Sequence, residues 1–190
     1  IGVEGNSSGF GLKKIGIEIG SNNHIIVDKN GKTNLDNIYA VGDVIGPPWL
    51  AHVSSSEGLY VVEHIAKLSP KKIDYDCVPA CTYSKPEIGS IGLSQKILDE
   101  RDIDYKVVKS FFNANGKAVA SDSTEGFIKI LVSDRNQILG AHIIGSNATE
   151  MISEFSLAMS NNLSVENILD SIHPHPTFSE AIFETLMQLR

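Results

Sequence analysis

The sequence predicts an α+β protein in two parts, residues 1–73 and residues 74–190. In the first part, a short apolar run ends in Gly42-Asp43, which is typical of a buried strand at the carboxyl edge of an open α/β sheet. The second part has five strand-like runs and amphipathic helical patterns, which indicate a sheet covered by helices. Between them, the polar run from Ser69 to Lys72 marks the predicted boundary.

Composition bounds the class of protein. The 190 residues are 42% hydrophobic and 21% charged, which is ordinary for a globular chain with a real core. A net charge of −7 and a pI near 5.3 supply no basic surface, so neither nucleic acid nor a membrane is an expected partner. No apolar run approaches the roughly 20 residues of a membrane span, and no signal peptide opens the sequence. Because Ile1 is not an initiator methionine, we expect a fragment.

The first part contains, in order, a glycine-rich run, two short strands and a helix. Gly9-Phe10-Gly11 is not a dinucleotide-binding motif, because Lys14 stands where the third glycine is needed and no strand precedes it. Strands are predicted over residues 24–27 and 38–41, with a tight Asn-Gly turn at 30–31 between them. A helix is predicted over residues 53–68, with an apolar stripe formed by Leu59, Val62, Ile65 and Ala66.

The second part predicts a sheet and its helical cover. Strands are expected over residues 78–83, 88–91, 105–111, 126–132 and 138–144, the last two joined by a turn at 134–136. Ser94 is a predicted N-cap for a helix that reaches Arg101, and Ser164 for a short later helix. The covering helix presents an apolar face made of Met151, Ile152, Phe155, Ala158 and Met159.

Two cysteines, Cys77 and Cys81, are too few for a disulfide-stabilised scaffold and indicate a reducing compartment. They begin an apolar strand-like run, whereas reactive cysteines favour helix N-termini and positive surroundings. We therefore expect both to pack as small apolar residues.

The run from His173 to Glu180 carries the most chemistry. Prolines 174 and 176 stiffen the backbone around His173 and His175, and Thr177 with Glu180 fits a capping box with Thr177 as the N-cap. An imidazole exchanges protons near neutral pH, and a neighbouring carboxylate would fix its tautomer. Two alternatives stay open: that Glu180 only caps a helix beside ordinary loop histidines, or that the His-x-His pair binds a metal, for which no further ligands are evident.

The run His-Pro-Thr-x-Ser-Glu resembles the C-terminal signature of the dihydrolipoamide dehydrogenases, in the pyridine nucleotide-disulfide oxidoreductase family. The resemblance implies that His175 is the acid–base residue and Glu180 its hydrogen-bonded partner. The Tyr-Ala-Val-Gly-Asp run similarly resembles the family's second FAD motif, which implies that Asp43 binds the ribityl chain of FAD. It also implies that Leu50, Ala51 and His52 run beside the flavin, with no catalytic role for His52.

The resemblance covers essentially the whole sequence, including Asn113-Ala114-Asn115-Gly116-Lys117-Ala118, but only the last two-fifths of a family chain. It implies that residues 1–73 end an FAD-binding domain and that residues 74–190 form an interface domain. A homodimer is expected, in which His175 and Glu180 act on the partner's redox disulfide, while the NAD site and that cysteine pair lie outside this sequence.

The implied activity is NAD-dependent oxidation of dihydrolipoamide on the lipoyl domains of 2-oxo acid dehydrogenase complexes, in the cytoplasm or the mitochondrial matrix. The fragment by itself is expected to be inactive. Two other interpretations remain, a glutathione- or trypanothione-type reductase and a non-catalytic dimerisation module. The run from Gly46 to His52 favours the lipoamide enzyme.

Overall fold

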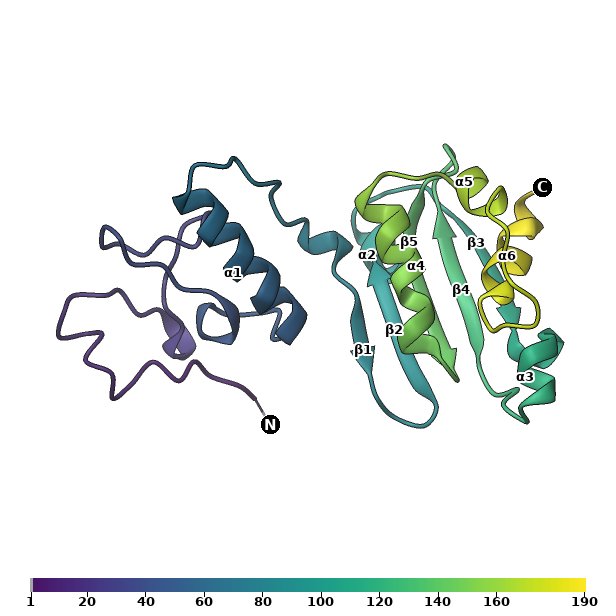
Figure 1. Cartoon of the computed structure of the whole chain (residues 1–190), viewed down its shortest axis with the longest axis horizontal. Coiled ribbons are helices and arrows are strands. Elements are labelled where there is room, and N and C mark those ends of the chain that lie inside the picture. The colour runs from purple at the N-terminus through teal and green to yellow at the C-terminus, as the bar shows by residue number, and fades with distance from the viewer. Residues whose placement is uncertain (1) are drawn as a thin grey trace. The chain divides into compact units, whose positions relative to one another are not determined.

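The computed structural model describes residues 2–190 and divides into two compact units (Figure 1). Unit 1 ends at Ile73, and unit 2 spans Asp74–Arg190. Among the described residues, no helix has both the length and the apolar character needed to cross a membrane.

Unit 1 consists of loops held around one long helix, α1 (Ala51–Ile65), with short 3-10 turns η1 (Ser21–Asn23) and η2 (Gly42–Ile45). The strands predicted over 24–27 and 38–41 do not form: each contributes one isolated bridge, Ile25 to Ile19 and Tyr39 to Lys32. Residues 38–41 are half-buried rather than enclosed on both faces. Extended segments need neighbouring strands for their backbone hydrogen bonds, and within residues 2–73 no such sheet surrounds them. The predicted turn at 30–31 is present, with the Gly31 N–H donating to the Asp28 carbonyl.

Helix α1 buries a different face from the predicted one. Val53, Glu57 and Val61, four residues apart, face the loops of unit 1 and are buried. The predicted stripe is exposed instead, at 67% for Leu59 and 65% for Val62. Hydrophobic spacing identified a helix correctly, but a helix with apolar residues on two sides does not reveal which side packs.

Unit 2 is built on a five-stranded antiparallel sheet in the order β1-β2-β5-β4-β3. The strands are β1 (Ala80–Thr82), β2 (Glu87–Gly92), β3 (Lys106–Phe111), β4 (Phe127–Val132) and β5 (Ile138–Gly145). All five predicted strands are confirmed. Strand β1 is shorter than expected, and Pro79, which has no N–H to donate, immediately precedes it.

Two of the helices of unit 2, α4 (Ala148–Ser160) and α6 (Glu180–Leu186), cover this sheet. The other helices are α2 (Gln95–Glu100), α3 (Gly116–Ala120) and α5 (Val165–Leu169), with 3-10 turns η3 (Tyr75–Cys77), η4 (Phe112–Ala114) and η5 (Met187–Leu189). Helix α4 packs on β2 and β5, and α6 packs on β3 and β4 (Figure 1). The predicted apolar face of α4 is confirmed, as are the N-cap positions of Ser94 and Ser164. Both covering helices join one core cluster, which includes Ile128, Ile130, Ile143, Phe155 and Ile182.

The contact between α4 and the sheet depends on Gly89 in β2. A Cβ atom at this position would lie 2.5 Å from the carbonyl oxygen of Ala148, the first residue of α4. Glycine therefore permits the helix start to approach the strand backbone closely.

Candidate functional site

His173 and His175 lie on the segment that joins α5 to α6, residues 170–179, here called the C-terminal strap, and Glu180 is the first residue of α6. His175 Nδ1 lies 2.8 Å from Glu180 Oε1. Since a carboxylate only accepts hydrogen bonds, Nδ1 is the donor, and Nε2 becomes the basic nitrogen of the neutral ring. The His175 side chain is 78% exposed, so this ring edge faces the surroundings of unit 2.

Glu180 is held on its other side by the strap backbone. The Thr177 N–H donates to Glu180 Oε2 at 2.7 Å, so each carboxylate oxygen has its own donor. The backbone donor of Thr177 first, and the His175 ring second, lower the pKa of Glu180 below its ordinary value. The carboxylate therefore stays ionised and fixed beside the ring.

The predicted capping box is only half formed. The N-cap of α6 is Ser179 rather than Thr177. The Thr177 hydroxyl instead donates to the Pro174 carbonyl at 2.7 Å, which leaves it turned away from the helix. The prediction that Thr177 is the N-cap was wrong because a strap carbonyl competes for its hydroxyl, whereas the expected bond from the Thr177 N–H to Glu180 is present.

His173 has a different environment from His175. Its Nε2 contacts Glu154 of α4 at 2.9 Å, its Nδ1 contacts the Ser171 carbonyl at 3.2 Å, and its ring lies beside Phe183. The side chain is only 9% exposed. A neutral imidazole donates from only one nitrogen, and Glu154 and Ser171 each place an acceptor beside the ring. His173 therefore fixes the strap to α4, and with its ring enclosed it offers no exposed edge to a substrate.

Within residues 2–190, no group of three or more His, Cys, Asp or Glu side chains could hold a metal ion. His173 and His175 contact separate carboxylates and do not converge.

The two cysteines have different surroundings. Cys81 packs against the core of unit 2, and burial first, then Glu87, raises the pKa of its thiol. Its apolar packing is thus confirmed. Cys77 lies in η3 and donates to the Asp74 carboxylate at 3.4 Å, so its predicted apolar packing was wrong. Neither is disulfide-bonded.

Unit 1 presents the second set of predicted residues around the turn Gly42-Asp43. Gly42 adopts φ +77, which favours glycine, and its buried N–H donates to Glu57 Oε2 of α1 at 2.6 Å. Glu57 is itself only 7% exposed. This bond fixes the turn against the helix and leaves the neighbouring Asp43 carboxylate at the surface.

Glu57 was missed by the sequence reasoning. Its spacing could have identified it: Glu57 lies four residues after Val53 and four residues before Val61, so the three side chains share one face of α1, and this is the buried face.

Leu50, Ala51 and His52 form the start of α1. Leu50 is the N-cap residue and makes no side-chain capping bond, and the first turn carries no acidic side chain. Ala51 and His52 are exposed. The positive end of the helix is therefore accessible to an electron-rich group. Together with Asp43, which can accept hydroxyl hydrogen bonds, these residues suit one side of an FAD site.

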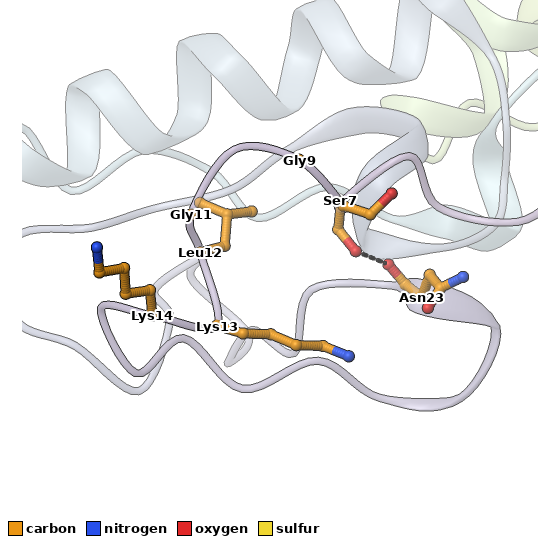
Figure 2. Close-up of a pocket in the computed structure, with 8 residues that line it drawn as sticks. Ser7, Gly9, Gly11, Leu12, Lys13, Lys14 and Asn23 are labelled. Atoms are coloured by element: carbon orange, nitrogen blue, oxygen red, sulfur yellow. Dashed lines mark hydrogen bonds between the residues drawn. The ribbon is translucent and has the colours of Figure 1, made fainter.

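The glycine-rich run borders a cavity of about 300 Å³, shown in Figure 2. The Ser7 hydroxyl closes its rim by donating to the Asn23 carbonyl at 2.7 Å. The side chains of Lys13 and Lys14 extend in opposite directions (Figure 2) and do not converge as a phosphate-binding pair.

Comparison with known proteins adds independent evidence. A family model described as "Pyridine nucleotide-disulphide oxidoreductase, dimerisation domain" matches residues 78–186, and a second, "Pyridine nucleotide-disulphide oxidoreductase", matches residues 1–58. The chain is 42% identical over 188 residues to a dihydrolipoyl dehydrogenase of Bacillus subtilis, covering 98% of this chain and 40% of that protein.

A mitochondrial dihydrolipoyl dehydrogenase of Sus scrofa is 42% identical over 185 residues, covering 97% of this chain and 36% of that protein. Among solved structures, LpdA from Mycobacterium tuberculosis matches with a TM-score of 0.92 at 27% identity, covering 98% of this chain and 41% of LpdA. The chain thus spans about two-fifths of the length of the proteins it matches.

Proposed function

Because the chain belongs to the pyridine nucleotide-disulphide oxidoreductase family, we propose that it supplies the acid–base pair of a dihydrolipoyl dehydrogenase, with His175 as the base and Glu180 as its orienting carboxylate. The observation that carries this proposal is the 2.8 Å contact between His175 Nδ1 and Glu180 Oε1 beside an exposed ring edge. The curated relatives named dihydrolipoyl dehydrogenase support dihydrolipoamide as the substrate.

The proposed step is a proton transfer. Nε2 of His175 accepts the proton of a substrate thiol, which leaves a nucleophilic thiolate and an imidazolium. The resulting imidazolium is stabilised by Glu180, whose two oxygens are already fixed by the ring and by the Thr177 N–H. The same imidazolium returns the proton when a thiol must re-form.

We assign FAD to the turn and the helix start in unit 1. Asp43 would accept hydroxyl hydrogen bonds of the cofactor, and the first turn of α1, from Leu50 to His52, would face an electron-rich part of it. A bound flavin supplies a two-electron acceptor for the oxidation of a dithiol. Glu57 contributes indirectly, because it holds the Gly42 N–H and thereby the position of Asp43.

We assign the remaining functions to the complete protein. Unit 2 would form a homodimer, in which the His175–Glu180 pair of one subunit serves the redox disulfide of the other, and lipoyl domains would present the substrate. NAD and the redox cysteines would be held by parts of the protein outside these 190 residues. Relatives include bacterial and mitochondrial enzymes, so either compartment is compatible.

The test is turnover of dihydrolipoamide with NAD by the complete enzyme that carries this chain. His175→Gln should lower kcat at least about a hundredfold, because positioned acid–base groups contribute 10²- to 10⁴-fold. The control is His173→Gln, whose fold and flavin content are checked first, since the His173 ring is enclosed between the strap and α4. Equal losses in the two variants, with intact fold and flavin, would reject His175 as the base. Turnover by the 190-residue chain alone would contradict the proposed division of the site.

A further inference from the structure

We propose that Asn115 is a positioning residue for the His175–Glu180 pair, acting through the backbone of Thr177. The inference rests on the proposed acid–base function of that pair. Asn115 lies 62 residues from Thr177 in the sequence, at the junction of η4 and α3, and is 1% exposed. Its side chain bonds to Thr177 and Ala118 rather than to His175 or Glu180.

The amide of Asn115 joins two parts of unit 2. Its Oδ1 accepts from the Ala118 N–H at 2.9 Å and caps α3. Its Nδ2 donates to the Thr177 carbonyl at 3.1 Å. The capping bond requires an acceptor and the strap bond requires a donor, so the orientation of the amide group is fixed by both partners. A buried amide satisfied at both ends holds them at a set separation.

Thr177 transmits this constraint to the carboxylate. Its carbonyl is held by Asn115, and its N–H donates to Glu180 Oε2 at 2.7 Å. The other oxygen of Glu180 receives the bond from His175. Three hydrogen bonds therefore run in sequence from the base of α3 to the imidazole ring, and each fixes the geometry of the next.

A second contact supports the same juxtaposition. Phe178 follows Thr177, and Phe112 begins η4, three residues before Asn115. Their rings meet edge to face, with centroids 6.0 Å apart and planes at 74°, and both are buried. The strap is thus held against residues 112–115 by an aromatic pair and by the amide, so loss of the amide alone should move Thr177 without detaching the strap.

Capping alone does not explain the asparagine. Serine and aspartate cap helices about as well, and Ser94 caps α2 by accepting from the Ile97 N–H. Asn115 also supplies a donor to Thr177 from a separate atom, which the single, shorter hydroxyl of serine and the carboxylate of aspartate do not. Asn115→Ser therefore keeps an acceptor that can cap α3 and removes the hydrogen bond to the Thr177 carbonyl. The matched control is Ser94→Ala, which removes the cap of α2, a helix that is not bonded to the strap through this cap.

The first measurement uses NMR on the 190-residue chain. In Asn115→Ser we expect the pKa of the Glu180 carboxyl to rise toward its ordinary value, and the Thr177 amide to exchange with solvent at least about tenfold faster than in the wild type. Signals of the His173 ring should stay in place, because Glu154 and Ser171 hold it independently. Ser94→Ala should leave all three readouts unchanged.

The second measurement is turnover by the complete enzyme. Misplacement of a catalytic group by about 1 Å can cost up to 10²-fold, so for Asn115→Ser we expect kcat to fall about tenfold with KM nearly unchanged. If Asn115→Ser does not fold, Asn115→Asp replaces it, since this near-isosteric change keeps the capping acceptor and removes the donor. Both should act in the same direction.

The outcomes separate the two proposals. Suppose that His175→Gln abolishes turnover, whereas the Asn115 variant keeps the wild-type kcat, the wild-type pKa of Glu180 and the wild-type exchange rate of the Thr177 amide. The positioning role of Asn115 is then wrong, and the acid–base assignment of His175 stands. If His175→Gln leaves turnover intact, the acid–base assignment fails, and the NMR readouts alone decide whether Asn115 holds Glu180.

Discussion

Removal of the Glu57 carboxylate should loosen the turn that presents Asp43. The bond from the Gly42 N–H is short, at 2.6 Å, and both residues are buried. Hydrogen bonds to charged groups contribute roughly 1.5–3 kcal/mol, and truncation also leaves a buried N–H without its acceptor. We expect Glu57→Ala to lower the free energy of unfolding of unit 1 by about 2–3 kcal/mol. Glu57→Gln, which retains an acceptor oxygen, should cost less.

The chain provides a specific probe for this experiment. Trp49 is the only tryptophan, it lies in unit 1 just before α1, and its ring lies near that of His24. Urea unfolding followed by tryptophan fluorescence therefore reports on unit 1, while far-UV circular dichroism is dominated by unit 2. Glu63→Ala, at an exposed position of the same helix, is the control and should change stability by less than about 0.5 kcal/mol. Equal midpoints for Glu57→Ala and Glu63→Ala would refute the structural role of Glu57.

Two further predictions concern unit 2. Because the pKa of Glu180 is lowered in the folded state, its ionised carboxylate should stabilise the fold above its ordinary pKa of about 4.3, and this contribution should disappear as pH falls through the lowered value. The difference in free energy of unfolding between wild type and Glu180→Gln, measured by urea unfolding from pH 7 to pH 3, should therefore shrink as pH falls. A difference that stays constant would contradict the assignment. Residues 74–190, which include the matched dimerisation domain, should sediment as a two-fold dimer, and a monomer at high concentration would count against this.

The fold of unit 2 was largely predictable from sequence because its signals are local. Alternating strands, the turn at 134–136 and the serine caps each depend on a few neighbouring residues, and all were found. The contact between His175 and Glu180 was predictable for the same reason, since five positions separate them at a helix start.

The remaining features depend on partners distant in sequence. The Thr177 hydroxyl had two possible acceptors, and the strap carbonyl at Pro174 prevailed. Asn115 appeared only as part of a motif, because its link to Thr177 spans 62 residues. In unit 1, the strand patterns were read correctly as apolar, but isolated bridges replaced strands because no sheet surrounds them among residues 2–73.

The exposed apolar side of α1 affects how the purified chain should be studied. Leu59, Val62 and Ile65 lie on one side of the helix and are each more than half exposed. Contiguous apolar patches of this kind promote association that is independent of any biological dimer. Sedimentation of the whole chain would then report two kinds of contact at once. Replacing Leu59 and Val62 with glutamine removes the first kind while leaving unit 2 intact, so that the mass measured for this variant reflects the dimerisation domain alone.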